Sequence, residues 1–234
     1  MALSQRAIGA PAPVELREVA RPVSLARERT LPVLAALEPL LPEGGLRRGA
    51  TVAVSGGTSL ALALVAGPSV AGSWCAAVGM PSLGLVAAAE VGVALERFPL
   101  VAGSRTDWPA VTAALLDAVD VVLLCPPPHV RASDARRLRA RARERGAVLV
   151  TTGASTPDAD VRLTMTRGEW EGLGRGHGRL AARRVEVVAT GRGAAARERR
   201  ASLWLPAPGG GVERLAGETP SGRVQLTNAG LGAR

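Results

Sequence analysis

The sequence contains no lysine, and all 29 of its basic residues are arginines. Chemistry that needs a side-chain ammonium group is therefore excluded. A GC-rich genome also produces proteins rich in arginine, alanine and glycine, so base composition can explain the lack of lysine without a functional reason. With 20 acidic residues, the formal net charge is +9. Such a basic balance is typical of proteins that bind nucleic acid or an acidic protein partner, and it does not choose between them.

Aromatic residues and cysteines are also scarce. There is no tyrosine, one phenylalanine and four tryptophans, so the core must be built mainly from valine, leucine and alanine. Cys75 and Cys125 each lie in an apolar run, which predicts buried thiols in a reducing compartment. No cysteine pair has zinc-ligand spacing, and His129 and His177 are isolated, so we expect no metal site.

Long uninterrupted apolar segments are missing too. No charged residue occurs from residue 49 to residue 89, but glycine, proline and serine interrupt this stretch several times. A membrane-spanning helix needs about 20 continuous apolar residues, so buried strand, helix and strand explain the stretch better. The N-terminus lacks the continuous apolar region of a signal peptide. We therefore expect a cytoplasmic protein without a membrane segment.

Short apolar runs alternate with helix-length segments through the middle of the chain. The expected strands are residues 50–54, 74–78, 98–102, 120–124 and 147–151. The expected helices are residues 60–66, 83–95, 108–118 and 133–144. This alternation predicts an α/β fold with a mostly parallel sheet flanked by helices.

The pattern changes after residue 153. Residues 161–166, 183–189 and 201–205 are expected strands with no helix between them, which predicts an antiparallel C-terminal extension of the sheet. We divide the chain into an N-terminal arm or short helix, a core and a Gly/Pro-rich C-terminal tail. These parts are residues 1–30, 31–206 and 207–234.

A glycine pair joins the first expected core strand to the first helix, which is the layout of a nucleotide-binding P-loop. A working P-loop needs six residues framed by glycines, then a lysine for the phosphates and a hydroxyl for Mg²⁺. Here the loop is too short, and a threonine occupies the lysine position. A tight strand-to-helix turn is the alternative explanation, and we expect no bound nucleotide or other cofactor. The degenerate P-loop consists of Ser55, Gly56, Gly57, Thr58 and Ser59.

Four segments in this order resemble the RecA/recombinase superfamily, and within it the ImuA-type accessory proteins of bacterial SOS mutagenesis. The resemblance covers residues 31–206 and implies a RecA-like fold of the P-loop NTPase type. The segments are residues 46–49, the degenerate P-loop, residues 84–93 and residues 159–163.

The chain departs from that family at the positions that perform catalysis. The resemblance places a Mg²⁺-binding aspartate after the fourth strand, where this chain has Cys125, and thiols are poor Mg²⁺ ligands. It places a water-orienting glutamate after the second strand, where the chain has residues 78–81 and no carboxylate. With Thr58 at the lysine position, three elements of phosphoryl transfer are missing together. We therefore expect that the protein has no ATPase activity and is not an enzyme.

The resemblance implies a non-catalytic adaptor in damage-induced mutagenesis and translesion DNA synthesis. Its expected partners are an ImuB-type inactive Y-family polymerase homologue and an error-prone replicative-type polymerase. Two alternatives remain: a cell-division regulator resembling SulA, and a module that binds DNA through arginines alone.

Two arginine-rich segments are candidate contacts for DNA or an acidic partner. Residues 131–145 contain seven arginines and two acids, and a solvated helix packed on the sheet is the alternative explanation. Residues 172–178 form a glycine-rich segment where the resemblance implies a mobile DNA-binding loop, and a surface hairpin is the alternative. The candidate residues are Arg136, Arg137, Arg139, Arg141, Arg167, Arg175 and Arg179.

Overall fold

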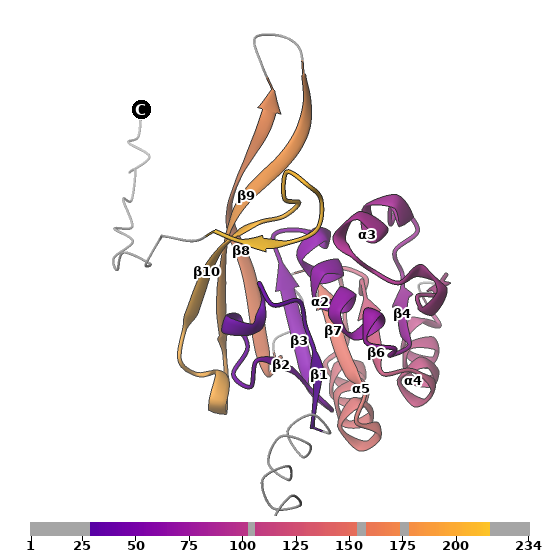
Figure 1. Ribbon diagram of the computed structural model, residues 1–234. Coiled ribbons are helices and arrows are strands. Elements are labelled where there is room, and N and C mark those ends of the chain that lie inside the picture. Colours follow the sequence, from indigo (N-terminus) through magenta and orange to yellow (C-terminus); the bar gives the residue numbers. More distant parts are fainter. Residues whose placement is uncertain (1–28, 103–105, 154–157, 174–177, 216–234) are drawn as a thin grey trace, which may run out of the picture.

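A sheet of nine strands organises the protein, as seen in a computed structural model that describes residues 29–102, 106–153, 158–173 and 178–215 (Figure 1). The strand order is β11-β10-β9-β8-β3-β7-β6-β4-β5. The last six strands in this order, from β8 to β5, are parallel to one another. They are β3 (Thr51–Ser55), β4 (Cys75–Val78), β5 (Leu100–Val101), β6 (Val121–Leu124), β7 (Val148–Thr152) and β8 (Val161–Leu173).

Helices cover both faces of the parallel strands. Helices α2 (Thr58–Val70) and α3 (Leu85–Val91) pack on one face, and α4 (Trp108–Ala118) and α5 (Ala132–Arg145) pack on the other. Because successive side chains of a strand point to opposite faces, Val121 and Leu123 contact the first pair of helices, while Val122 and Leu124 contact the second pair. The sequence prediction of an α/β fold with a mostly parallel sheet is confirmed.

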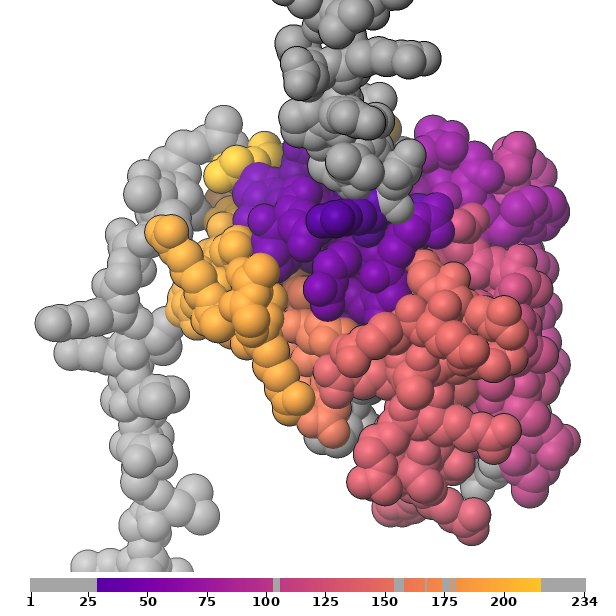
Figure 2. Space-filling view, turned by 90° about the horizontal axis from the view of Figure 1, so that it is seen from below, coloured from indigo at the N-terminus to yellow at the C-terminus, as the bar shows by residue number. Residues whose placement is uncertain are grey.

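Helix α2 lacks a polar face because it is covered on its outer side as well. Nine of its 13 residues are buried. The covering segment is a short hairpin, β1 (Thr30–Pro32) and β2 (Gly45–Arg47), with the 3-10 turn η1 (Glu38–Leu40) between its strands. A side chain at Gly67 would meet the backbone of Val33, so the glycine permits this close approach. Figure 2 shows the segment, in indigo, between the orange antiparallel strands and helix α5.

The C-terminal strands form the predicted antiparallel extension. Strand β9 (Gly178–Gly191) pairs with β8 and with β10 (Arg199–Trp204), and β10 pairs with β11 (Glu213–Arg214). The 3-10 turn η3 (Gly193–Ala195) joins β9 to β10. Apart from Ala182, the buried residues of these strands belong to the core on the α2 side, and within the described ranges no helix packs on their other face. The β8–β9 hairpin extends beyond the body of the molecule (Figure 1).

Some boundaries differ from the sequence prediction. The helix expected at residues 83–95 ends at Gly92, whose φ of +103° suits glycine, and a separate 3-10 turn η2 (Leu95–Arg97) follows. Of the glycine-rich segment expected as a loop, residues 172 and 173 belong to β8 and residue 178 begins β9, while residues 174–177 lie outside the described residues. The described fold reaches Leu215, past the expected start of the tail at residue 207, because β11 pairs with β10. No helix in the described ranges is long and apolar enough to span a membrane.

Candidate functional site

The glycine turn after β3 is held by close packing against strand β8. Gly56 has a φ of +94°, and a Cβ at this position would collide with the carbonyl oxygen of Met165. A Cβ on Gly57 would lie 2.5 Å from Cε of the same methionine. The Ser55 hydroxyl donates a hydrogen bond of 3.1 Å to the Thr164 hydroxyl of β8. The fold therefore requires the glycine at position 56, whereas at position 57 the flexible end of the methionine side chain could move aside.

The three degenerate positions of the sequence lie together in space. Thr58 and Ser59, the loop that begins at Gly79, and Cys125 all line one cleft of about 500 Å³ at the carboxyl ends of β3, β4 and β6. Ligands of α/β proteins bind at this edge of the sheet. The sequence argument treated these positions one by one, and the fold makes them parts of one site.

The remaining walls of this carboxyl-edge cleft come from elements outside the degenerate motifs. Helix α3 contributes Glu90, and the β8–β9 hairpin contributes Trp170, Leu180 and Arg183. Leu205, which follows β10, closes the base. Among the described residues of the lining, Glu90 and Arg183 are the two that carry a charge. The site is thus a largely apolar hollow between α3 and the hairpin.

The prediction that both thiols are buried is correct for Cys75 and wrong for Cys125. Cys75 lies fully inside the sheet, and burial, with a smaller contribution from the negative charge of Asp120, raises its pKa to about 12. Cys125 is exposed because β6 ends at Leu124 and the chain leaves the sheet there toward the cleft. An apolar run that ends at a strand terminus does not bury its last residue.

This difference predicts selective alkylation. Because the thiolate is the reactive form, a maleimide at neutral pH should modify Cys125 and leave Cys75 unmodified. Intact-mass spectrometry should show one adduct on the folded protein and two after unfolding in urea. Cys125→Ser should abolish the single adduct, and an adduct that persists in this variant would contradict the assignment.

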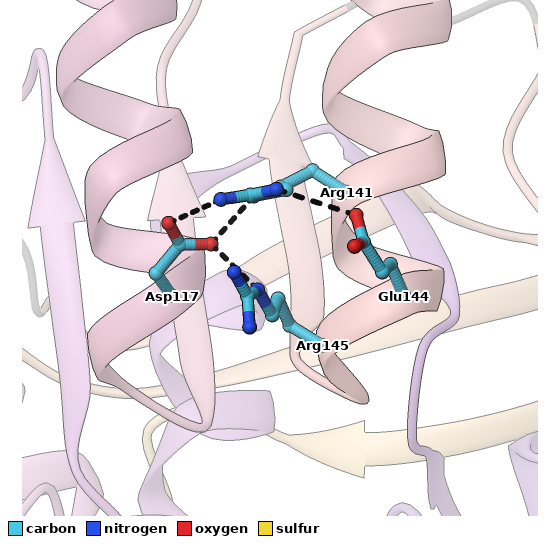
Figure 3. A network of polar contacts seen from close by, with 4 residues as sticks. All are labelled: Asp117, Arg141, Glu144 and Arg145. Carbon is cyan, nitrogen blue, oxygen red and sulfur yellow. Dashed lines mark hydrogen bonds and ion pairs between the residues drawn. The ribbon is translucent and has the colours of Figure 1, made fainter.

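The arginines of α5 are largely engaged within the molecule. Arg141 donates two hydrogen bonds of 2.6 Å to the Asp117 carboxylate of α4 and one of 3.3 Å to Glu144 (Figure 3). Arg145 joins the same carboxylate at 3.1 Å. Arg139 donates to Asp160 at 3.1 Å. Two of the predicted contact residues therefore link α5 to its neighbours.

Arg136 and Arg137 differ from these two residues. Both are exposed, and neither forms an ion pair with any part of the chain that the structure describes. They are the two members of the predicted helix set that remain available to a partner.

The Asp117 network predicts a specific pH dependence. Hydrogen bonds from Arg141, supported by the charges of Arg141 and Arg145, lower the pKa of Asp117 below its ordinary value. The folded state then binds this proton less readily than the unfolded state, so the contribution to stability is present above about pH 4 and lost as the pH falls further. Urea unfolding should show that Asp117→Asn destabilises near neutral pH and that the difference from the wild type shrinks in acid. Glu144→Gln, which alters a more exposed carboxylate, should show little of this dependence.

The predicted DNA-binding loop lies largely outside the described residues. Arg175 lies outside them, as do the side chains of Arg167 and Arg179, whose backbones belong to β8 and β9. The hairpin instead presents a pair that sequence analysis missed, in which the Arg183 guanidinium lies 5.5 Å from the centre of the Trp170 ring. Their pairing follows from the strand register, in which the two residues are directly opposite.

Comparison with known proteins identifies the parallel half of the molecule. The model of the MT3502 N-terminal domain family matches residues 39–158. The chain belongs to this family. The match runs from η1 past the end of β7 and includes the glycine turn and Cys125, whereas the β8–β9 hairpin lies outside it.

The chain is similar to the uncharacterized protein Rv3395c of Mycobacterium tuberculosis. It is 34% identical over 152 residues, which cover 64% of this chain and 74% of the relative.

Proposed function

We propose that this protein is a non-catalytic adaptor of the RecA-like type, acting in damage-induced mutagenesis and translesion DNA synthesis. It would bind an ImuB-type inactive Y-family polymerase homologue and, through it, an error-prone replicative-type polymerase. One observation carries the proposal: the positions that would perform phosphoryl transfer meet in a single cleft, and they hold Thr58, Pro81 and Cys125.

The chemistry of these positions supports a binding role. Phosphoryl transfer depends on cationic and metal stabilisation of the phosphates and on an oriented nucleophile. A threonine, a proline and a thiol supply neither the ammonium group nor the oxygen ligands that Mg²⁺ prefers. The one carboxylate of the lining, Glu90, belongs to α3 rather than to a strand end.

The fold supports the RecA-like part of the proposal. The resemblance implies a mostly parallel sheet, helices on both faces and an antiparallel extension, and the protein has each of these. It also implies a glycine turn between a core strand and a helix, and that turn is present between β3 and α2. Packing of Gly56 against Met165 explains why the turn would persist after a phosphate site was lost.

The test is association with the polymerase homologue. The tagged full chain, expressed in its own host after DNA damage, should recover an ImuB-type protein at near-physiological salt. Recombinant copies of the two proteins should co-elute in size-exclusion chromatography. Failure of the purified pair to associate would overturn the partner assignment. Phosphate release from ATP above background, with or without single-stranded DNA, would overturn the non-catalytic part.

Arg136 and Arg137, which are exposed and form no ion pair with another described residue, support DNA binding as a second candidate function. Arginine contacts to phosphates release counterions, so affinity for DNA should fall steeply as salt rises. Glutamine at both positions should remove this binding, and affinity that does not depend on salt would contradict the mechanism.

A further inference from the structure

Exposed apolar side chains are concentrated on the two elements that form walls of the carboxyl-edge cleft, helix α3 and the β8–β9 hairpin. Among the described residues nine large hydrophobic side chains are exposed, and five of them lie on α3 or on the β8–β9 hairpin. Contiguous exposed apolar surface marks interaction sites more often than scattered single residues do. The five are Leu85, Val86, Trp170, Leu173 and Leu180, exposed by 45, 73, 43, 64 and 50%.

The same cleft contains a cation without a counter-charge. Arg183 forms no ion pair with any described residue, and its Nε is buried without a hydrogen-bond partner. Its neighbour Arg184 points to the other face of the hairpin, where it lies 3.6 Å from Glu171 and 5.2 Å from the centre of the Trp204 ring. A buried donor without a partner is energetically costly. A ligand that places an acceptor at Arg183 would remove this cost, whereas Arg184 already has Glu171 as a partner.

The shape of the surface favours a peptide segment over a small molecule. Trp170 and Leu180 line the hollow itself, but Leu173 and Val86 lie on the same two elements outside its lining. A small molecule that filled about 500 Å³ would not reach these side chains outside the lining. A peptide segment that crosses from the hairpin to α3 would cover both the cleft and the exposed side chains outside it. Tryptophan and arginine, which pair with each other in the lining, are among the residue types that dominate binding energies at protein interfaces.

We propose that this cleft docks a segment of a partner protein that has apolar side chains next to a carboxylate. The apolar groups pack between Trp170 and α3, and the carboxylate accepts hydrogen bonds from Arg183. Glu90, on the α3 wall, disfavours a second acidic group there and so orients the segment. The inference rests on the adaptor function proposed above and assigns its binding surface.

Selection from a display library of short random peptides on the immobilised full chain tests the specificity. Enriched peptides should combine leucine, phenylalanine or similar residues with an aspartate or glutamate. Bound peptide should also protect Cys125, which lines the cleft, from maleimide. Enrichment without acidic residues, protection by ATP instead of peptide, or binding of a second copy of the chain would each overturn the proposal.

Charge reversal at adjacent hairpin positions provides the matched controls. Arg183→Glu should weaken peptide binding at least about tenfold, whereas Arg184→Glu should change it less than about threefold. Arg183→Met, which keeps the apolar stem, should weaken binding as well and guards against misfolding of the glutamate variant. Val86→Glu on α3 should weaken binding, and Val70→Glu, exposed by 69% at the far end of α2, should not.

The two proposals fail in different ways. If the polymerase homologue binds the wild-type chain and binds Arg183→Met equally well, the adaptor role stands and the cleft is the wrong surface. If the homologue does not bind at all, the partner assignment falls, while the peptide selection still decides the specificity of the cleft.

Discussion

Gly56→Ala is expected to lower the free energy of unfolding by about 3–5 kcal/mol. Two costs add at this position. The backbone φ of +94° is strained for any residue with a Cβ, and the added methyl would collide with the carbonyl oxygen of Met165. Since β3 and β8 are paired strands, relief of the collision would require their separation. Urea unfolding followed by circular dichroism measures the loss.

Gly72→Ala separates the two costs. Gly72 has a φ of +97°, nearly that of Gly56, but a Cβ there would have nothing within 4 Å. Its expected destabilisation is therefore only the conformational part, about 1–2 kcal/mol. Equal losses at the two positions would show that packing against Met165 contributes nothing and that the backbone conformation alone selects glycine at position 56.

Sequence alone predicted the parallel half of the fold because local and global signals agree there. Short apolar runs, helix-length segments and turn residues alternate regularly, and the runs of β3, β4, β6 and β7 are buried on both faces, so an error of one residue in a boundary changes nothing essential. The glycine turn was located correctly for the same reason. Helix α5 was also recognisable as the helix expected at residues 133–144, and Leu138 and Ala142 form its buried face.

The side-chain pairing within the β8–β9 hairpin could not be predicted from the sequence in the same detail. Its pattern is interrupted by an irregularity in register between Met165 and Arg167, which changes the faces to which later side chains point. Whether Trp170 meets Arg183 or Arg184 depends on that irregularity, and no local signal in the sequence gives its position. The same limit applies to α5, because the acid that binds Arg141 lies 24 residues away on another helix.

Asp160, which sequence analysis noted only as part of a family-like segment, joins three elements. Its Oδ2 accepts a hydrogen bond of 2.9 Å from the backbone N–H of Thr51 at the start of β3. Its Oδ1 accepts one of 3.1 Å from Arg139 of α5. Its own backbone N–H donates to the Thr51 carbonyl at 2.9 Å, which positions the start of β8. The carboxylate is mostly buried, with 16% of its side chain exposed.

Asp160→Ala is therefore expected to destabilise the protein by about 2–4 kcal/mol, because it leaves a partly buried N–H and a partly buried guanidinium without their acceptor. Urea unfolding of both proteins measures the difference. Asp158→Ala, two residues away, removes an exposed ion pair of 2.7 Å with Arg192 and should change stability by less than about 0.5 kcal/mol. Arg139→Met added to Asp160→Ala should recover part of the loss, since the unpaired charge is then gone. A double variant less stable than Asp160→Ala alone would mean that Arg139 stabilises the fold through its packing and not through this carboxylate.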